Sequence, residues 1–162
     1  MRCTKRGVMS VSFINKLFKS KSNDDFCTAV VLAAGNSQRM GKDKILMPLG
    51  GAPVIAHTLK ALQSAECIDE IVVVTKYERL QELADICHDH GISKASKVVV
   101  GGKTRLESSL IGVSNADERA KYIAIHDGAR PFVTNSLIER VVHSAHQHGA
   151  SAPAVSATDR VL

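Results

Sequence analysis

"AVVLAAGNSQRMGKDK", residues 29–44, begins as an apolar run and ends as a basic loop with two glycines. The apolar run is short and contains no polar residue, which is typical of a strand that is buried on both faces. Gly35 follows it, and a residue without a Cβ lets the backbone turn and approach a ligand closely. Arg39 and Lys44 lie in the same loop. Backbone N–H groups flanked by such cations can bind an anion, so the stretch indicates an anion site at the end of a strand.

The spacing within this loop excludes two common phosphate-binding motifs. A P-loop requires G-x4-G-K-[ST], whereas five residues separate Gly35 from Gly41, and Asp43 follows Lys42. The dinucleotide fingerprint G-x-G-x-x-G is absent as well. Two interpretations of the loop remain open: an anion site of another kind, and an ordinary turn with surface lysines.

The rest of the chain alternates between strand and helix patterns. Short apolar runs of strand type occupy residues 70–75, 97–101, 122–127 and 150–157. Apolar residues recur at helical spacing in four stripes, which are Ile55, Leu59 and Leu62; Leu80, Leu83, Ala84 and Cys87; Leu106, Leu110 and Val113; and Leu137, Val141 and Ala145. Such alternation produces parallel strands with right-handed crossovers between two helix layers. The sequence therefore predicts an α/β fold, a three-layer α/β/α sandwich with a mostly parallel, Rossmann-like sheet.

Length and charge indicate one folded domain preceded by a basic extension. The 162 residues suffice for one domain with a hydrophobic core. Residues 1–26 carry six Lys or Arg against two Asp, which accounts for most of the formal net charge of +5. We expect this stretch to be a flexible N-terminal extension and the domain to begin at residue 27.

Composition disfavours several classes of protein. The part from residue 27 on is nearly neutral, and aromatic residues make up 4% of the chain with no Trp, so no nucleic-acid partner is expected. No apolar run approaches the roughly 20 residues that span a bilayer, so no membrane partner is expected either. The four cysteines form no C-x-x-C pair, which suits neither a zinc site nor a disulfide framework and fits a cytoplasmic protein.

Two further polar segments follow predicted strands. "GGKTRLES", residues 101–108, offers paired glycines for close backbone approach. "HDGARP", residues 126–131, places Asp127 at the end of a strand. That carboxylate either serves a metal, a ribose or a phosphate, or pairs with Arg130 to fasten the turn. Because ligands of open α/β sheets bind outside the carboxyl ends of the strands, we expect both segments and the opening loop to share one site.

The three segments together resemble those of the 2-C-methyl-D-erythritol 4-phosphate cytidylyltransferases. The shared pattern is LAAG-x3-RMG, a downstream Lys, GG-x2-R-x2-S and HD-x-ARP, and the resemblance extends over residues 27–162. It implies a sandwich of the nucleotide-diphospho-sugar transferase type. It also implies transfer of CMP from CTP to 2-C-methyl-D-erythritol 4-phosphate with release of pyrophosphate, in non-mevalonate isoprenoid precursor biosynthesis. Mg²⁺, bound mainly through the CTP phosphates, and a cytoplasmic homodimer are implied in addition.

The resemblance also implies roles for individual residues. Arg39 and Lys44 would bind the triphosphate and stabilise the transition state. Asp127 and Ala129 would hold the ribose. The cytosine would be surrounded by Ala33, Ala34, Gly35, Gly102, Lys103 and Ser108. Arg105 and Arg130 would help to order the site and its substrate phosphates. No protein side chain is expected to serve as a metal ligand.

Two departures from the family pattern leave alternatives open. "DKILMPLGG", residues 43–51, is also similar to the loop of molybdenum-cofactor nucleotidyltransferases. Another nucleotidyltransferase, of that type or of a ribitol-phosphate type, is therefore the nearest alternative. Family members continue beyond the position of Leu162. We therefore expect residues 27–162 to lack the C-terminal part of the nucleotidyltransferase domain, and a non-catalytic nucleotide-binding fragment is the second alternative.

Overall fold

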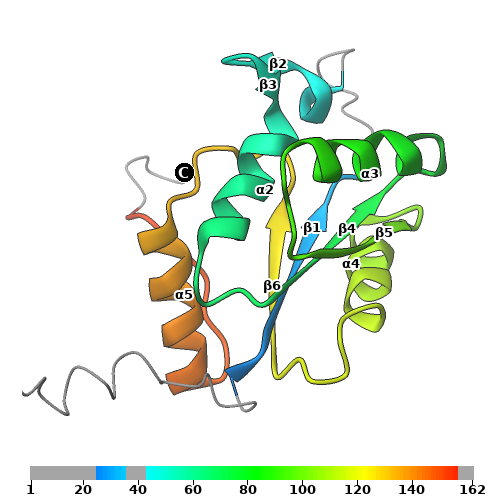
Figure 1. Cartoon of the computed structure of the whole chain (residues 1–162). Helices are drawn as coiled ribbons and strands as arrows, with labels where there is room; N and C mark the ends of the chain where they lie inside the picture. Colours follow the sequence, from blue (N-terminus) through cyan, green and yellow to red (C-terminus); the bar gives the residue numbers. More distant parts are fainter. Residues whose placement is uncertain (1–24, 36–42, 157–162) are drawn as a thin grey trace, which may run out of the picture.

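Four parallel strands form the central sheet of the computed structural model, which describes residues 25–35 and 43–156 (Figure 1). The strands are β1 (Cys27–Leu32), β4 (Glu70–Thr75), β5 (Ala95–Val100) and β6 (Tyr122–Asp127), and their order across the sheet is β5-β4-β1-β6. Val30 of β1 lies opposite Val72 of β4 on one side and opposite Ile125 of β6 on the other. Every pair in this sheet is parallel, so all four strands end at the same edge.

Helices cover both faces of the sheet. On one face lie α2 (Val54–Ser64), α3 (Leu80–Asp89) and α5 (Asn135–His148), and on the other lies α4 (Arg105–Ser114) (Figure 1). The larger core lies on the face with three helices, where Val31 of β1 packs with Leu59 of α2 and Leu83 of α3, all fully buried. The predicted three-layer α/β/α sandwich with a parallel sheet is confirmed.

Short elements connect these strands and helices. They are the 3-10 turn η2 (Lys44–Leu46), the antiparallel pair β2 (Pro48–Leu49) and β3 (Ala52–Pro53), and the 3-10 turn η3 (Tyr77–Arg79) between β4 and α3. Gly50 and Gly51 have φ angles of 55° and 86°, which residues with a Cβ rarely adopt. The tight turn between β2 and β3 therefore requires glycine at both positions.

The predicted buried stripe of α4 is wrong. Leu106 and Leu110 are 70% and 60% exposed, and Val113 is exposed as well. The residues of α4 that are buried are instead Ser108, Ser109 and Gly112. A Cβ on Gly112 would lie 2.2 Å from Val30 Cγ1. The helix therefore lies so close to β1 that only small residues fit between them.

The predicted strand at residues 150–157 is also wrong over its described part. Residues 150–156 are exposed and belong to no strand. Ser151 donates its hydroxyl to the Val141 carbonyl of α5 at 2.6 Å. An apolar run becomes a strand only where its backbone groups find hydrogen-bonding partners, and this run forms no ladder with β6. β6 is accordingly an edge of the four-stranded sheet.

Candidate active site

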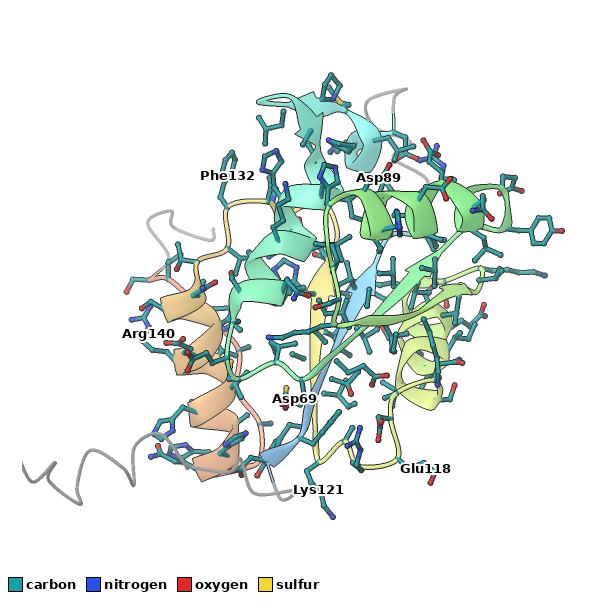
Figure 2. The ribbon with its side chains drawn as sticks, viewed as in Figure 1. Asp69, Asp89, Glu118, Lys121, Phe132 and Arg140 are labelled. Atoms are coloured by element: carbon teal, nitrogen blue, oxygen red, sulfur yellow. The ribbon has the colours of Figure 1, made fainter. Side chains whose placement is uncertain are left out.

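The three predicted segments meet at the carboxyl edge of the sheet. Backbone hydrogen bonds fix the first residues after β1, β5 and β6. Ala33 N–H donates to Val74 O at 2.7 Å, Gly101 N–H to Thr75 O at 2.7 Å, and Gly128 N–H to Leu32 O at 2.9 Å. The charged residues Asp69, Glu118 and Lys121 lie at the opposite edge (Figure 2). The parallel sheet thus brings together segments that are far apart in the sequence, as the strand-end rule predicts.

A cavity of about 610 Å³ lies at this edge. Its lining includes Ala34, Gly102 and Lys103, which are three of the residues predicted to surround a cytosine. The other three do not line it: Ala33 is buried, Gly35 is exposed, and Ser108 is buried with its hydroxyl 3.4 Å from the Gly102 carbonyl oxygen. The cavity is also lined by Thr75, Tyr77 and Glu107, which are not among the predicted site residues.

The position of Glu107 is one reason why residues 101 and 102 are both glycines. Its carboxylate accepts a hydrogen bond from Lys103 N–H at 2.7 Å, and its own N–H donates to Thr104 Oγ1 at 3.1 Å. This exchange at the start of α4 is a variant of the T-x-x-E capping box. A Cβ on Gly102 would lie 2.3 Å from Glu107 Cβ, and one on Gly101 would lie 2.8 Å from Ala34 Cβ. Both glycines therefore allow the close packing of α4 against the strand ends.

Asp127 holds two arginines from different elements. Arg105 Nη2, on α4, donates to Asp127 Oδ1 at 3.0 Å, and Arg130 Nε lies 2.9 Å from Asp127 Oδ2. The pairing of Asp127 with Arg130, one of the two alternatives from the sequence, is therefore present, and Arg105 pairs with the same carboxylate. This group of three residues, the Asp127 cluster, has a net charge of +1 and lies next to the exposed Ala129. One carboxylate thus positions two guanidinium groups that retain donors for an anion.

Lys44 lies on a turn that is tied to the segment after β4. It is the first residue of η2 and is half-buried. The Asp43 carboxylate accepts a hydrogen bond from Ile45 N–H at 3.3 Å and forms an ion pair with Arg79 of η3. The prediction for Arg39 falls on residues 36–42, outside the described residues.

Comparison with known proteins decides the family. A profile of the family described as 2-C-methyl-D-erythritol 4-phosphate cytidylyltransferase matches residues 27–162. The chain belongs to this family. Proteins of that name from Clostridium botulinum and Halalkalibacterium halodurans are each 35% identical to it over 136 residues. These matches cover 83% of this chain and 59% of each relative, so the chain spans about three fifths of the length of the relatives.

The cytidylyltransferase family also appears among solved structures with this fold. The crystal structure described as 4-diphosphocytidyl-2C-methyl-D-erythritol synthase from Anaerococcus prevotii matches with a TM-score of 0.66 at 26% identity. The match covers 77% of this chain and 52% of that chain. The resemblance that the three sequence segments indicate is therefore confirmed at the level of the family and the fold.

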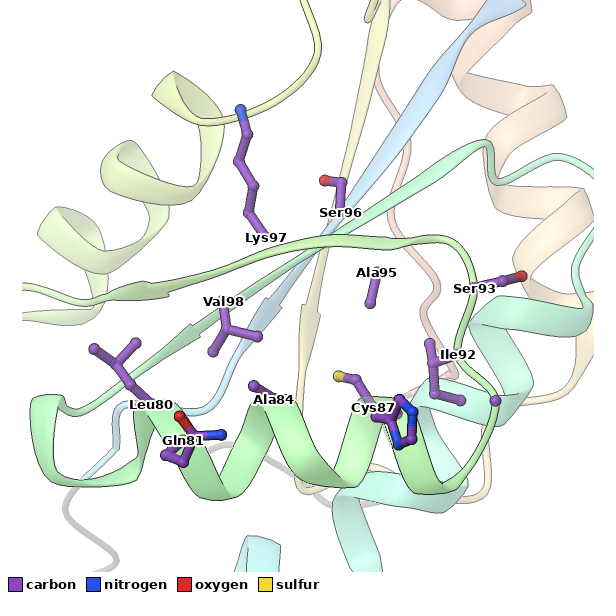
Figure 3. A pocket seen from close by; sticks show the side chains of 12 residues that line it. Leu80, Gln81, Ala84, Cys87, Ile92, Ser93, Ala95, Ser96, Lys97 and Val98 are labelled. Atoms are coloured by element: carbon purple, nitrogen blue, oxygen red, sulfur yellow. The ribbon is translucent and has the colours of Figure 1, made fainter.

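Other features of this cytidylyltransferase-family chain lie outside the site. Cys87 lines a second cavity, of about 670 Å³, between α3 and β5, and no residue of the three segments lines it (Figure 3). Burial raises the pKa of the Cys87 thiol to about 11, which makes it a poor nucleophile at neutral pH. Within residues 25–35 and 43–156, no three His, Cys, Asp or Glu side chains are grouped to hold a metal ion. No helix in these ranges is long and apolar enough to cross a membrane.

Proposed function

We propose that this chain binds CTP at the carboxyl edge of its sheet and transfers CMP to 2-C-methyl-D-erythritol 4-phosphate with release of pyrophosphate. The observation that carries the proposal is that the three family segments meet at one edge of the sheet, where the first two line one cavity and the last two form one arginine–aspartate cluster. Family membership supports this reaction, which serves the synthesis of isoprenoid precursors by the non-mevalonate pathway.

In the proposed complex the nucleotide extends along the sheet edge. The cytosine occupies the cavity beside Gly102 and Lys103, where the lining comes from the ends of β1, β4 and β5. The ribose lies toward Asp127 and Ala129, after β6. The triphosphate lies toward Lys44, and the resemblance to the family assigns Arg39 to the same phosphates. The Asp127 cluster, with its net charge of +1, attracts the phosphates of CTP and of the acceptor.

The reaction requires charge and position more than covalent chemistry from the protein. An oxygen of the acceptor phosphate attacks the α-phosphorus of CTP, and the bond from that phosphorus to the leaving pyrophosphate oxygen breaks. The acceptor is a phosphate monoester with a second pKa of about 6, so it is anionic at neutral pH and needs no general base. Lys44 and the two arginines of the Asp127 cluster stabilise charge on the phosphate oxygens. Mg²⁺ that is bound through the CTP phosphates would supply further positive charge.

Replacement of Lys44 tests the proposal. We expect Lys44→Met to lower the rate of pyrophosphate release from CTP and 2-C-methyl-D-erythritol 4-phosphate by about 10²–10³, because one transition-state cation is lost. Lys60→Met, at an exposed position of α2, is the matched control and should retain the wild-type rate. Release of pyrophosphate from GTP with a pterin acceptor, and none from CTP, would support the molybdenum-cofactor alternative instead.

A non-catalytic nucleotide-binding fragment is the second candidate. The observation that favours it is the 59% share of the relatives that the chain covers. It predicts that the chain binds CTP but releases no pyrophosphate when the acceptor is present. For the full cytidylyltransferase we propose a cytoplasmic homodimer, and sedimentation of the purified chain tests whether residues 1–162 suffice for that assembly.

A further inference from the structure

Tyr77 is an exposed aromatic residue at the cavity of about 610 Å³. It begins η3, two residues after Thr75 ends β4, and 75% of its surface is exposed. The only other tyrosine, Tyr122, packs against His146 with ring centroids 4.0 Å apart, and the chain contains no Trp. The Tyr77 ring therefore contributes little to the core, although it lines the cavity that the proposed function assigns to a nucleobase.

The rest of the cavity lining suits a flat, uncharged group. Gly101 and Gly102 form part of the lining without side chains. The charged residues of the lining are two lysines and two glutamates, namely Lys76, Lys103, Glu78 and Glu107, so their charges balance. The cations that suit phosphates, Lys44 and the arginines of the Asp127 cluster, do not line this cavity. The charge distribution thus favours the base of a nucleotide here and its phosphates elsewhere.

Thr75 gives the same cavity a hydroxyl without a partner. Thr75 is fully buried, lines the cavity, and its Oγ1 makes no hydrogen bond within the described part of the chain. Buried hydroxyl groups are nearly always hydrogen-bonded, because leaving one unsatisfied costs free energy. Such a hydroxyl can donate a hydrogen bond to a ring nitrogen or a carbonyl oxygen on the edge of a base, or accept one from an amino group there.

We propose that Tyr77 stacks on the base of the bound nucleotide and that the Thr75 hydroxyl bonds to the edge of that base. Both residues end or follow β4 and lie outside the three family segments. This inference rests on the proposed function, because it concerns the nucleotide of that reaction. Stacking on an aromatic ring strengthens base binding and is tolerant of base identity, whereas a hydroxyl bond is directional. Tyr77 therefore determines affinity, and Thr75 contributes to the choice of base.

Tyrosine fluorescence tests the stacking directly. Because the chain has no Trp, its emission comes from Tyr77 and Tyr122 alone. CTP should quench the wild-type protein and the control variant Tyr122→Phe, whereas Tyr77→Phe should show no quenching beyond absorption by the nucleotide. By calorimetry, Tyr77→Phe should bind CTP like the wild type, and Tyr77→Ala should bind it about tenfold more weakly. Inorganic tripolyphosphate, which has no base, should bind to all variants equally.

Thr75→Val tests the hydroxyl, since it keeps the shape of the side chain. It should weaken CTP binding severalfold while its melting temperature stays equal to or above that of the wild type, because an unsatisfied buried hydroxyl is removed. Wild-type affinity of Tyr77→Ala for CTP would overturn the stacking proposal and leave the proposed function intact. Equal weakening of CTP and tripolyphosphate binding by Tyr77→Ala would also overturn it. A wild-type protein that binds tripolyphosphate but not CTP would overturn both.

Discussion

Replacement of Asp127 by Asn separates the role of the Asp127 cluster in the site from its role in folding. The Asp127 carboxylate is 33% exposed, and its partners Arg105 and Arg130 are 66% and 72% exposed. Ion pairs at such exposure contribute about 0–1 kcal/mol each to stability. Loss of both pairs should therefore lower the free energy of unfolding by about 1 kcal/mol. For a domain of this size, that change corresponds to a melting temperature lower by roughly 2–4 °C.

We expect the rate of pyrophosphate release in the proposed reaction to respond more strongly than stability does. Without the carboxylate, the guanidinium groups of Arg105 and Arg130 lose the partner that holds them at 3.0 and 2.9 Å. Displacement of a positioned group by about 1 Å can cost roughly 10²-fold in rate, and we expect a loss of that order. Salt at about 1 M, where the screening length is about 3 Å, should move the wild-type rate toward that of the variant.

Asp117→Asn is the matched control for this prediction. Asp117 pairs with Arg119 at 2.8 Å, and its backbone N–H donates to Glu70 at the start of β4, far from the carboxyl edge. Hydrogen bonds from Arg119 hold the pKa of the Asp117 carboxyl below its usual range, as they do for a paired carboxylate. The control should melt slightly lower and keep the wild-type rate. Equal loss of rate in both variants would refute a positioning role for Asp127.

Two further substitutions test packing and titration. Gly112→Ala gains about 1 kcal/mol of helix propensity, but its Cβ would lie 2.2 Å from Val30 Cγ1. Because overpacking costs about 1–3 kcal/mol, we expect a net loss of stability in urea, which the exposed control Ser114→Ala should not show. Burial lowers the pKa of His126 below its ordinary 6.5, so the unfolded chain binds a proton more readily than the folded chain. Stability should fall as the pH drops through about 6.5, and His126→Asn should reduce that slope; an unchanged slope would contradict this assignment.

The sequence predicts the strands because burial on both faces leaves a clear pattern. β1 and β4 lie between two helix layers, so Val30 and Val72 and their neighbours are apolar on either side. Their parallel pairing then places the ends of distant segments at one edge. The sequence does not predict which face of α4 is buried. The helix approaches β1 so closely that Ser108 and Gly112, rather than leucines, are buried. Side-chain size identifies a buried face only when a helix packs at the usual distance.

The segments that the sequence selects follow β1, β5 and β6, whereas the segment after β4, which also lines the cavity, was not selected. Residues after β1, β5 and β6 carry glycines or known motifs, whereas the segment after β4 carries neither. The strand-end rule alone, applied to "EIVVVTKY", would have selected Thr75 and Tyr77. Glu107 was signalled by its spacing from Thr104, since T-x-x-E before an apolar run predicts a capping box. Only the structure shows that this carboxylate also lines the cavity.

The same substitution in α4 and in α2 tests whether the leucines of α4 are exposed. Leu110→Ala and Leu59→Ala make the same chemical change, but Leu110 is 60% exposed and Leu59 is fully buried. Leu59→Ala should lower the free energy of unfolding by about 2–5 kcal/mol, because it leaves a cavity in the core. Leu110→Ala should change it by no more than about 0.5 kcal/mol, as at other exposed positions. If Leu110→Ala lowered the free energy of unfolding in urea by more than about 1.5 kcal/mol, the leucines of α4 would have to be packed against other groups. That result would contradict an exposed leucine face on α4.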